Sequence, residues 1–153
     1  MKQGFTLFEF LFVMGIIVML AAIALPQYRI AVERARTAEA LSNGRSLTDS
    51  MNRSLLLSPN TPPDSREMLD VNINNGKWVS NTQCNTNDFS YDISNGSFLE
   101  IVRDNDGTEL YRLRLYNRYV PADDGKLECL WSTSLGKKIC TLLERSGYTV
   151  QQL

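Results

Sequence analysis

The stretch that decides the fold is residues 1–26, which read MKQGFTLFEFLFVMGIIVMLAAIALP. After a polar leader over residues 1–4, the chain is apolar from Phe5 to Leu25. Only three positions interrupt the run: Thr6, Glu9 and Gly15. A helix of about 21 residues is about 30 Å long, which matches the hydrocarbon thickness of a bilayer. The stretch therefore predicts one membrane-spanning helix.

Glu9 is out of place in such a helix, because an unpaired carboxylate near the end of a span costs roughly a few kcal/mol. A cut between Gly4 and Phe5 would expose an α-amine one helical turn from Glu9. In a helical stack of subunits, that amine could pair with Glu9 of the next subunit. The cost of the charge would then be offset only on assembly, which favours ordered polymerisation.

The segment GFTLFEF, the apolar run and the following LPQY resemble the N-terminus of type IV pilins and of type II secretion pseudopilins. In that family a membrane aspartic protease, the prepilin peptidase, cuts after the glycine and N-methylates the new first residue. The resemblance implies that Gly4 ends the leader and that Phe5 is the methylated residue. It assigns assembly roles to Glu9, Thr6 and Pro26. It also implies a structural subunit and not an enzyme.

The same resemblance implies the partners and the location. The subunit would be stored in the inner membrane, meet the prepilin peptidase and a pilus or secretion assembly platform, and pack with its own copies into a helical filament. Lys2 and the lack of an acid in the leader place the leader in the cytoplasm and the C-terminal domain outside. A cell-surface pilus is the first expectation, and a periplasmic secretion pseudopilus is the alternative.

Two other interpretations of the N-terminus remain open. Ala22-Ile23-Ala24 offers the cleavage site of an ordinary secretory signal, which would release a soluble binding protein after Ala24. The apolar run is longer than the roughly 7–15 residues of such signals, and it contains an acid. An ordinary single-pass anchor with an accidental glutamate is the second.

Composition limits the function of the rest. The chain has 153 residues, a net charge of −1, 43% hydrophobic residues and no histidine. The span leaves about 125 residues, enough for one modest domain. Neither a nucleic-acid partner nor a disordered tail is indicated. Without histidine, the commonest general base and the commonest transition-metal ligand are missing, and we expect no catalytic site, cofactor or metal.

Two acidic turns are the only candidates for calcium. Asp104 and Asp106 resemble part of a calcium loop, but Val102 and Leu113 stand where the template needs acids. The turn at 121–125 contains two aspartates, and some pseudopilins bind calcium near the C-terminus. Solvated turns are the default expectation at both places.

The three cysteines are Cys84, Cys129 and Cys140, with no CxxC pair. The oxidising side of the membrane permits a disulfide. A Cys129–Cys140 bridge would close a short C-terminal loop, and the resemblance supports this pairing, because a disulfide often bounds such a loop in type IV pilins. Cys84 would then be buried and free. The alternative pairs Cys84 with Cys129 and leaves Cys140 over.

Residues 5–56 are predicted to form one helix, kinked at Pro26 and weakened at Asn43-Gly44. Its halves are a span or filament core over 5–26 and an amphipathic part over 27–56. Glu33 and the other charged residues of the second half should mostly point away from the sheet. The inward stripe is predicted to contain Ala31, Ala35, Ala38, Leu41, Thr48, Met51 and Leu55.

The remaining residues predict a connecting loop region over 57–87, with Trp78-Val79 as its buried anchor, followed by an antiparallel sheet and a cysteine loop over 88–153. Strands are expected at 88–93, 97–103, 109–116 and 127–131, with a hairpin loop at 104–107. In the third strand Tyr111, Leu113 and Leu115 should face the helix, and the two arginines between them should face water or a neighbouring subunit. The fold class is therefore α+β, as in pilins.

Overall fold

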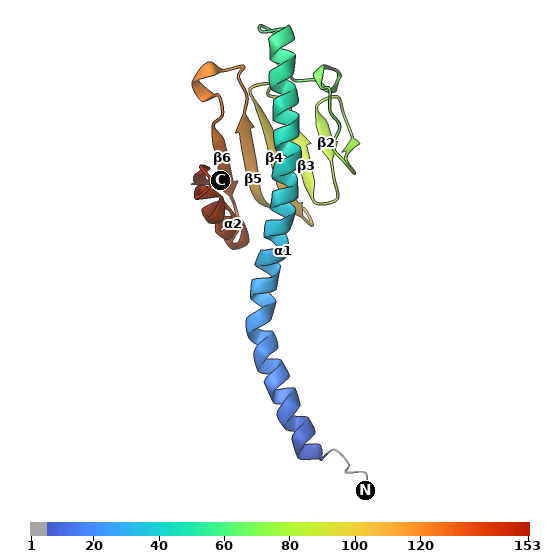
Figure 1. Cartoon of the computed structure of the whole chain (residues 1–153), viewed down its shortest axis with the longest axis vertical. Helices are drawn as coiled ribbons and strands as arrows, with labels where there is room; N and C mark the ends of the chain where they lie inside the picture. The colour runs from blue at the N-terminus through green and yellow to red at the C-terminus, as the bar shows by residue number, and fades with distance from the viewer. Residues whose placement is uncertain (1–5) are drawn as a thin grey trace.

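The computed structural model describes residues 6–153 and has an α+β fold (Figure 1). One long helix, α1 (Leu7–Leu57), carries a sheet domain on its second half, and its first half projects beyond that domain. The other elements are η1 (Arg66–Met68), β1 (Lys77–Trp78), β2 (Gln83–Asn85), β3 (Phe89–Asp92), β4 (Phe98–Asn105), β5 (Thr108–Tyr116), η2 (Pro121–Asp123), β6 (Leu127–Trp131), α2 (Ser134–Glu144) and β7 (Thr149–Gln152). The α+β fold predicted from the sequence is confirmed.

The seven strands form one sheet in sequence order. Strands β1 to β6 pair antiparallel with their neighbours. After β6 the chain crosses through α2, so β7 returns parallel to β6 and the sheet is not wholly antiparallel as predicted. The predicted hairpin is confirmed between β4 and β5, where Asp106 (φ 52°) and Gly107 (φ 77°) adopt the left-handed conformation of a tight turn.

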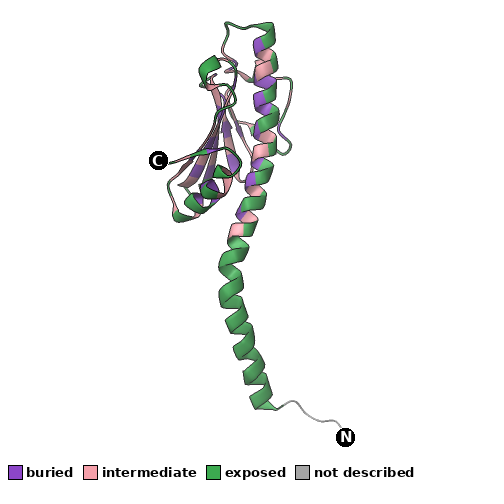
Figure 2. Cartoon of the chain, turned by 60° about the vertical axis from the view of Figure 1, so that its left-hand side comes forward, coloured by how far each residue is buried: buried purple, intermediate pink, exposed green. Residues whose placement is uncertain are grey.

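The two halves of α1 have different surroundings. Figure 2 shows a first half that is exposed all round and a second half with a buried stripe against the sheet. The helix continues through Pro26, and Figure 1 shows a gradual bend rather than a sharp kink. Proline removes one backbone hydrogen bond and crowds the preceding turn, which bends a helix without having to end it. Before the chain turns at Pro59, the helix ends where the N–H of Ser58 donates to the Ser54 carbonyl.

The core lies between the second half of α1 and one face of the sheet. Tyr111, Leu113 and Leu115 are fully buried there, as predicted. Gly44 lets the helix approach closely, since a Cβ at this position would lie 2.6 Å from Ile101 Cδ1. The helix continues without a break through Asn43-Gly44, and the glycine there serves packing.

The inward stripe of α1 differs from the predicted one. Leu41 is half-buried, and Thr48, Met51 and Leu55 are buried as predicted. The prediction was wrong for Ala31, Ala35 and Ala38, which are exposed. The inward positions are instead Glu33, Thr37, Ala40, Gly44 and Leu47. Polar residues enter the stripe because partners on the sheet satisfy them, as described below.

Two predicted loops contain regular structure. Residues 57–87 contribute β1 and β2 to the sheet, and the buried residues of this region are Pro63, Ile73 and Cys84. Trp78 is half-buried and Val79 is 58% exposed, so Val79 is not the expected anchor. The predicted cysteine loop is mostly helix α2, whose N-cap Thr133 accepts a hydrogen bond from the Gly136 N–H.

The face of the sheet away from α1 carries a ladder of ion pairs. Arg112 pairs with Glu100 and Glu109, and Arg114 pairs with Glu100 and lies 3.9 Å from Glu128. These arginine side chains are 24% and 27% exposed. They point away from α1 as predicted, and each is paired with carboxylates of the same sheet face.

Candidate functional site

The first half of α1 is an unpartnered apolar surface. Its large apolar side chains between Leu7 and Leu25 are 44–79% exposed. Within residues 6–153, α1 is the one helix that is long and apolar enough to cross a bilayer. Apolar surface of this extent marks a membrane or protein contact. The first half of α1 is therefore a candidate membrane span, as the sequence predicted.

Thr6 and Glu9 form a capping box at the start of this helix. Glu9 Oε2 accepts from the Thr6 N–H at 3.0 Å and from the Thr6 hydroxyl at 2.8 Å, while the Glu9 N–H donates to Thr6 Oγ1 at 3.2 Å. The polar groups of the helix start are thereby satisfied reciprocally. Within residues 6–153, Glu9 Oε1 has no hydrogen-bond partner.

The capping box changes the expectation for Glu9. Hydrogen bonds from Thr6 within the same chain already reduce the cost of the Glu9 carboxylate in an apolar setting. The signal for it was in the sequence, since Thr6 and Glu9 have the T-x-x-E spacing of a capping box before an apolar run. Among residues 6–153, Thr6 thus engages one carboxylate oxygen of Glu9 and not the other.

A buried polar clamp joins α1 to the sheet where the exposed half of the helix ends. The Arg103 Nε of β4 donates to Glu33 Oε1 at 2.7 Å, and both residues are 4% exposed. The Tyr111 hydroxyl donates to the same oxygen at 3.1 Å and lies 2.8 Å from Thr37 Oγ1. Sequence reasoning missed this clamp, formed by Glu33, Thr37, Arg103 and Tyr111.

The surroundings of the clamp set its ionisation. Burial raises the pKa of Tyr111 above its ordinary value, and the neighbouring Glu33 carboxylate opposes deprotonation further. Burial alone would lower the pKa of Arg103, but the hydrogen bond and ion pair with Glu33 outweigh it and raise that pKa. The clamp therefore holds a charged pair beside a neutral tyrosine.

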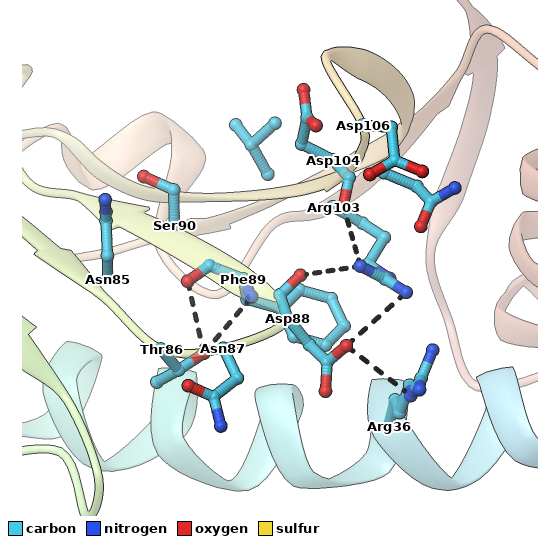
Figure 3. Close-up of a pocket in the computed structure, with 12 residues that line it drawn as sticks. Arg36, Asn85, Thr86, Asn87, Asp88, Phe89, Ser90, Arg103, Asp104 and Asp106 are labelled. Atoms are coloured by element: carbon cyan, nitrogen blue, oxygen red, sulfur yellow. Dashed lines mark hydrogen bonds and ion pairs between the residues drawn. The ribbon is translucent and has the colours of Figure 1, made fainter.

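A hollow of about 400 Å³ adjoins the clamp, between the β2–β3 connection and the β4–β5 turn (Figure 3). Asp88 lies at its centre, with Oδ1 3.5 Å from both Arg36 Nε and Arg103 Nη2. Two guanidinium groups thus already neutralise its charge. Asp104 Oδ1 accepts from the Gly107 N–H, which stabilises the turn. These contacts give Asp88 and Asp104 structural roles.

The acidic turn that could have held calcium is similarly paired. Asp123 lies 3.6 Å from the Lys126 ammonium, and Asp124 lies 3.4 Å from Arg118. Throughout the described chain, residues 6–153, no three or more metal-ligating side chains come together. The turn has the geometry of paired surface charges.

The disulfide joins Cys129 of β6 to Cys140 of α2, with Cα atoms 5.5 Å apart. This predicted pairing is confirmed, and the alternative with Cys84 is wrong. Cys84 is buried and free, and burial raises its pKa, so its thiol stays protonated. The bridge fixes α2 to the sheet and thereby holds the crossover that leads into β7.

The predicted cleavage and methylation residues, Gly4 and Phe5, lie outside the described residues. Comparisons of the chain with protein-family models, with curated proteins and with solved structures give no match. The features that bear on function are the apolar half of α1, its capping box and the domain that the clamp holds on its other half.

Proposed function

We propose that the chain is a structural subunit of a type IV pilus-like filament. The prepilin peptidase would cut it between Gly4 and Phe5 and methylate the Phe5 amine. The subunit would wait in the inner membrane with the leader in the cytoplasm and the sheet domain outside. An assembly platform would then extrude it, so that the first halves of α1 pack together and the sheet domains form the filament surface.

The observation that carries the proposal is a single helix with two environments. The first half of α1 exposes apolar side chains on every side, whereas the second half is fixed to the sheet domain by the core and the clamp. A helix that is apolar all round requires lipid or other helices around it. Lipid would surround the first half of α1 while the chain is stored in the membrane, and other helices would surround it in the filament.

In this proposal Glu9 determines the axial register in which neighbouring subunits pack. Its Oε2 is held by Thr6, and its Oε1 has no partner among the described residues. The amine created at Phe5 of a neighbouring subunit would bind this oxygen in an apolar surrounding, where a charge-assisted hydrogen bond is strong. Misaligned subunits would leave both charges unpaired, so the pair favours one axial register.

The test compares Glu9→Ala with Glu39→Ala, which removes the same group from an exposed position of the same helix. Membrane fractionation should find both variants inserted like the wild type. Filaments are sheared from the cells, collected by sedimentation and viewed by electron microscopy. The yield of filaments should fall about tenfold or more for Glu9→Ala, because losing about 1.4 kcal/mol of subunit association weakens that association about tenfold. Normal filament yield from Glu9→Ala would contradict the pairing.

A pseudopilus of a type II secretion system is the second candidate. It shares the same subunit physics, and the Cys129–Cys140 disulfide favours the pilus, because the resemblance associates such a C-terminal disulfide with pilins. Electron microscopy of the cell surface separates the two candidates. Long external filaments on cells that make the protein support a pilus. The absence of such filaments, together with loss of protein secretion when the gene is deleted, supports a pseudopilus.

A further inference from the structure

A second hollow lies where the exposed half of α1 meets the sheet domain. It has a volume of about 400 Å³ and is formed by α1 and the start of α2. In both Figure 1 and Figure 2, α2 lies at the end of the sheet domain that faces the projecting half of α1. Its lining includes four apolar residues and two cations, Leu25, Pro26, Ile30, Leu135, Arg29 and Lys138.

The two cations of this hollow differ from the arginines nearby. Within residues 6–153, neither Arg29 nor Lys138 makes an ion pair, whereas Arg36 and Arg103 nearby are bound to Glu33 and Asp88. Between Leu7 and Tyr28 the sole acid is Glu9, at the far end of the exposed half. The hollow is therefore positively charged and opens beside an apolar helix surface.

Helix geometry predicts the level of the hollow relative to the membrane. Leu25 ends the apolar run, and Arg29 lies four residues further along the helix, about 6 Å at 1.5 Å per residue. The headgroup layer occupies about 5–7 Å beyond the hydrocarbon on each side of a bilayer. When α1 spans the membrane, Arg29 and Lys138 thus stand at the level of lipid phosphates, and Tyr28 stands where interfacial aromatics are favoured.

We propose that this hollow binds the headgroup of an anionic phospholipid of the outer leaflet, before the subunit is assembled. The phosphate lies between Arg29 and Lys138, and the acyl chains follow the exposed half of α1 past Leu25 and Pro26. The bound lipid sets the height of the sheet domain above the membrane. This inference rests on the membrane step of the proposed function and goes beyond it in naming a ligand.

The test uses the full chain, purified in a mild detergent and freed of lipid, with native mass spectrometry to count bound lipids. Phosphatidylglycerol, phosphatidylcholine and inorganic phosphate are the probes. The double variant Arg29→Gln/Lys138→Gln is compared with Lys77→Gln/Arg145→Gln, which removes two exposed cations elsewhere. When phosphatidylglycerol is added back, the wild type and this control should each bind one molecule. Arg29→Gln/Lys138→Gln, the hollow variant, should bind it about tenfold or more weakly, as expected for the loss of two cations near a lipid surface.

Three outcomes would overturn the inference. Equal retention of phosphatidylcholine would show that charge is irrelevant, and displacement by inorganic phosphate would show a free-anion site. Loss of self-association in the hollow variant, with lipid binding unchanged, would show that a second copy occupies the hollow. Carbonate extraction of reconstituted vesicles reports insertion separately: a chain that is extracted contradicts the proposed function as well, whereas an inserted chain without lipid preference contradicts this inference alone.

Discussion

Glu33 and Arg103 form a buried ion pair between residues 70 positions apart, with Arg103 Nε 2.7 Å from Glu33 Oε1. The pair lies at the point where α1 leaves the sheet domain. Arg103 Nη1 also donates to the carbonyls of Asp88 and Asp104, and its Nη2 donates to Glu33 Oε2 at 3.4 Å. The sheet domain is thereby fixed to one position along the helix, which any assembly through the first half of α1 requires.

Glu33→Gln should destabilise the sheet domain by about 3–5 kcal/mol, because it leaves the Arg103 charge buried and unpaired. Urea unfolding of the full chain in mild detergent, followed by circular dichroism, measures the change. Glu39→Gln, the same substitution at an exposed position of α1, should change the free energy of unfolding by about 0.5 kcal/mol or less. Equal effects of the two variants would contradict a structural role for the pair.

Alkaline pH should destabilise the protein through Tyr111. Its pKa is raised by burial, so the folded state binds more protons than the unfolded state above pH about 10. The stabilisation is complete below that pH and is lost as the pH rises, by up to about 1.4 kcal/mol per pH unit.

Tyr111→Phe tests this pH dependence. It should cost about 1–3 kcal/mol at neutral pH through lost hydrogen bonds to Glu33 and Thr37. The difference from the wild type should shrink in urea unfolding above pH about 10, because phenylalanine does not titrate. A difference that stays constant across this range would show that the hydroxyl titrates freely.

Gly136→Ala should destabilise the protein by about 1–3 kcal/mol. A Cβ at Gly136 would overlap the backbone carbonyl of Leu110, so α2 would have to move away from β5. Gly15→Ala is the matched control in α1, where a Cβ meets nothing within 4 Å. Thermal unfolding in detergent should show a lower midpoint for Gly136→Ala alone, and a shared effect would remove the close approach as its cause.

Reduction of the Cys129–Cys140 disulfide should lower the free energy of unfolding by about 3 kcal/mol, the value expected for a loop of this length in the chain-entropy model. Protease digestion should then begin in residues 134–153, which the bridge holds to β6. The double variant Cys129→Ala/Cys140→Ala should be cut equally with and without reductant. If reductant also accelerates cleavage of that variant, the effect comes from elsewhere.

Local signals predicted much of this fold. The apolar run indicated the long helix, alternation and an Asp-Gly turn indicated the β4–β5 hairpin, and spacing with the family resemblance indicated the disulfide. These features depend on residues close in the sequence. The Thr6–Glu9 capping box is equally local, since its T-x-x-E spacing is visible in the sequence.

The missed features depend on distant residues or on very short elements. Glu33 appears as a solvent-facing helix residue until Arg103 is placed beside it, 70 positions away. Burying such a charge is tolerated only with a hydrogen-bonded partner, which helix periodicity does not reveal. Strands β1 and β2 have two and three residues, too few to show alternation. They form because β3 offers an edge for them to pair with.

The mass of the mature N-terminus tests the central claim most directly. The account requires that the chain, isolated from membranes or filaments, begins at Phe5 with a methylated amine, since Glu9 needs that amine as its partner. Mass spectrometry of the N-terminal peptide should find N-methyl-Phe5. A protein that begins at Met1, or at Leu25 after signal cleavage, would contradict the filament account.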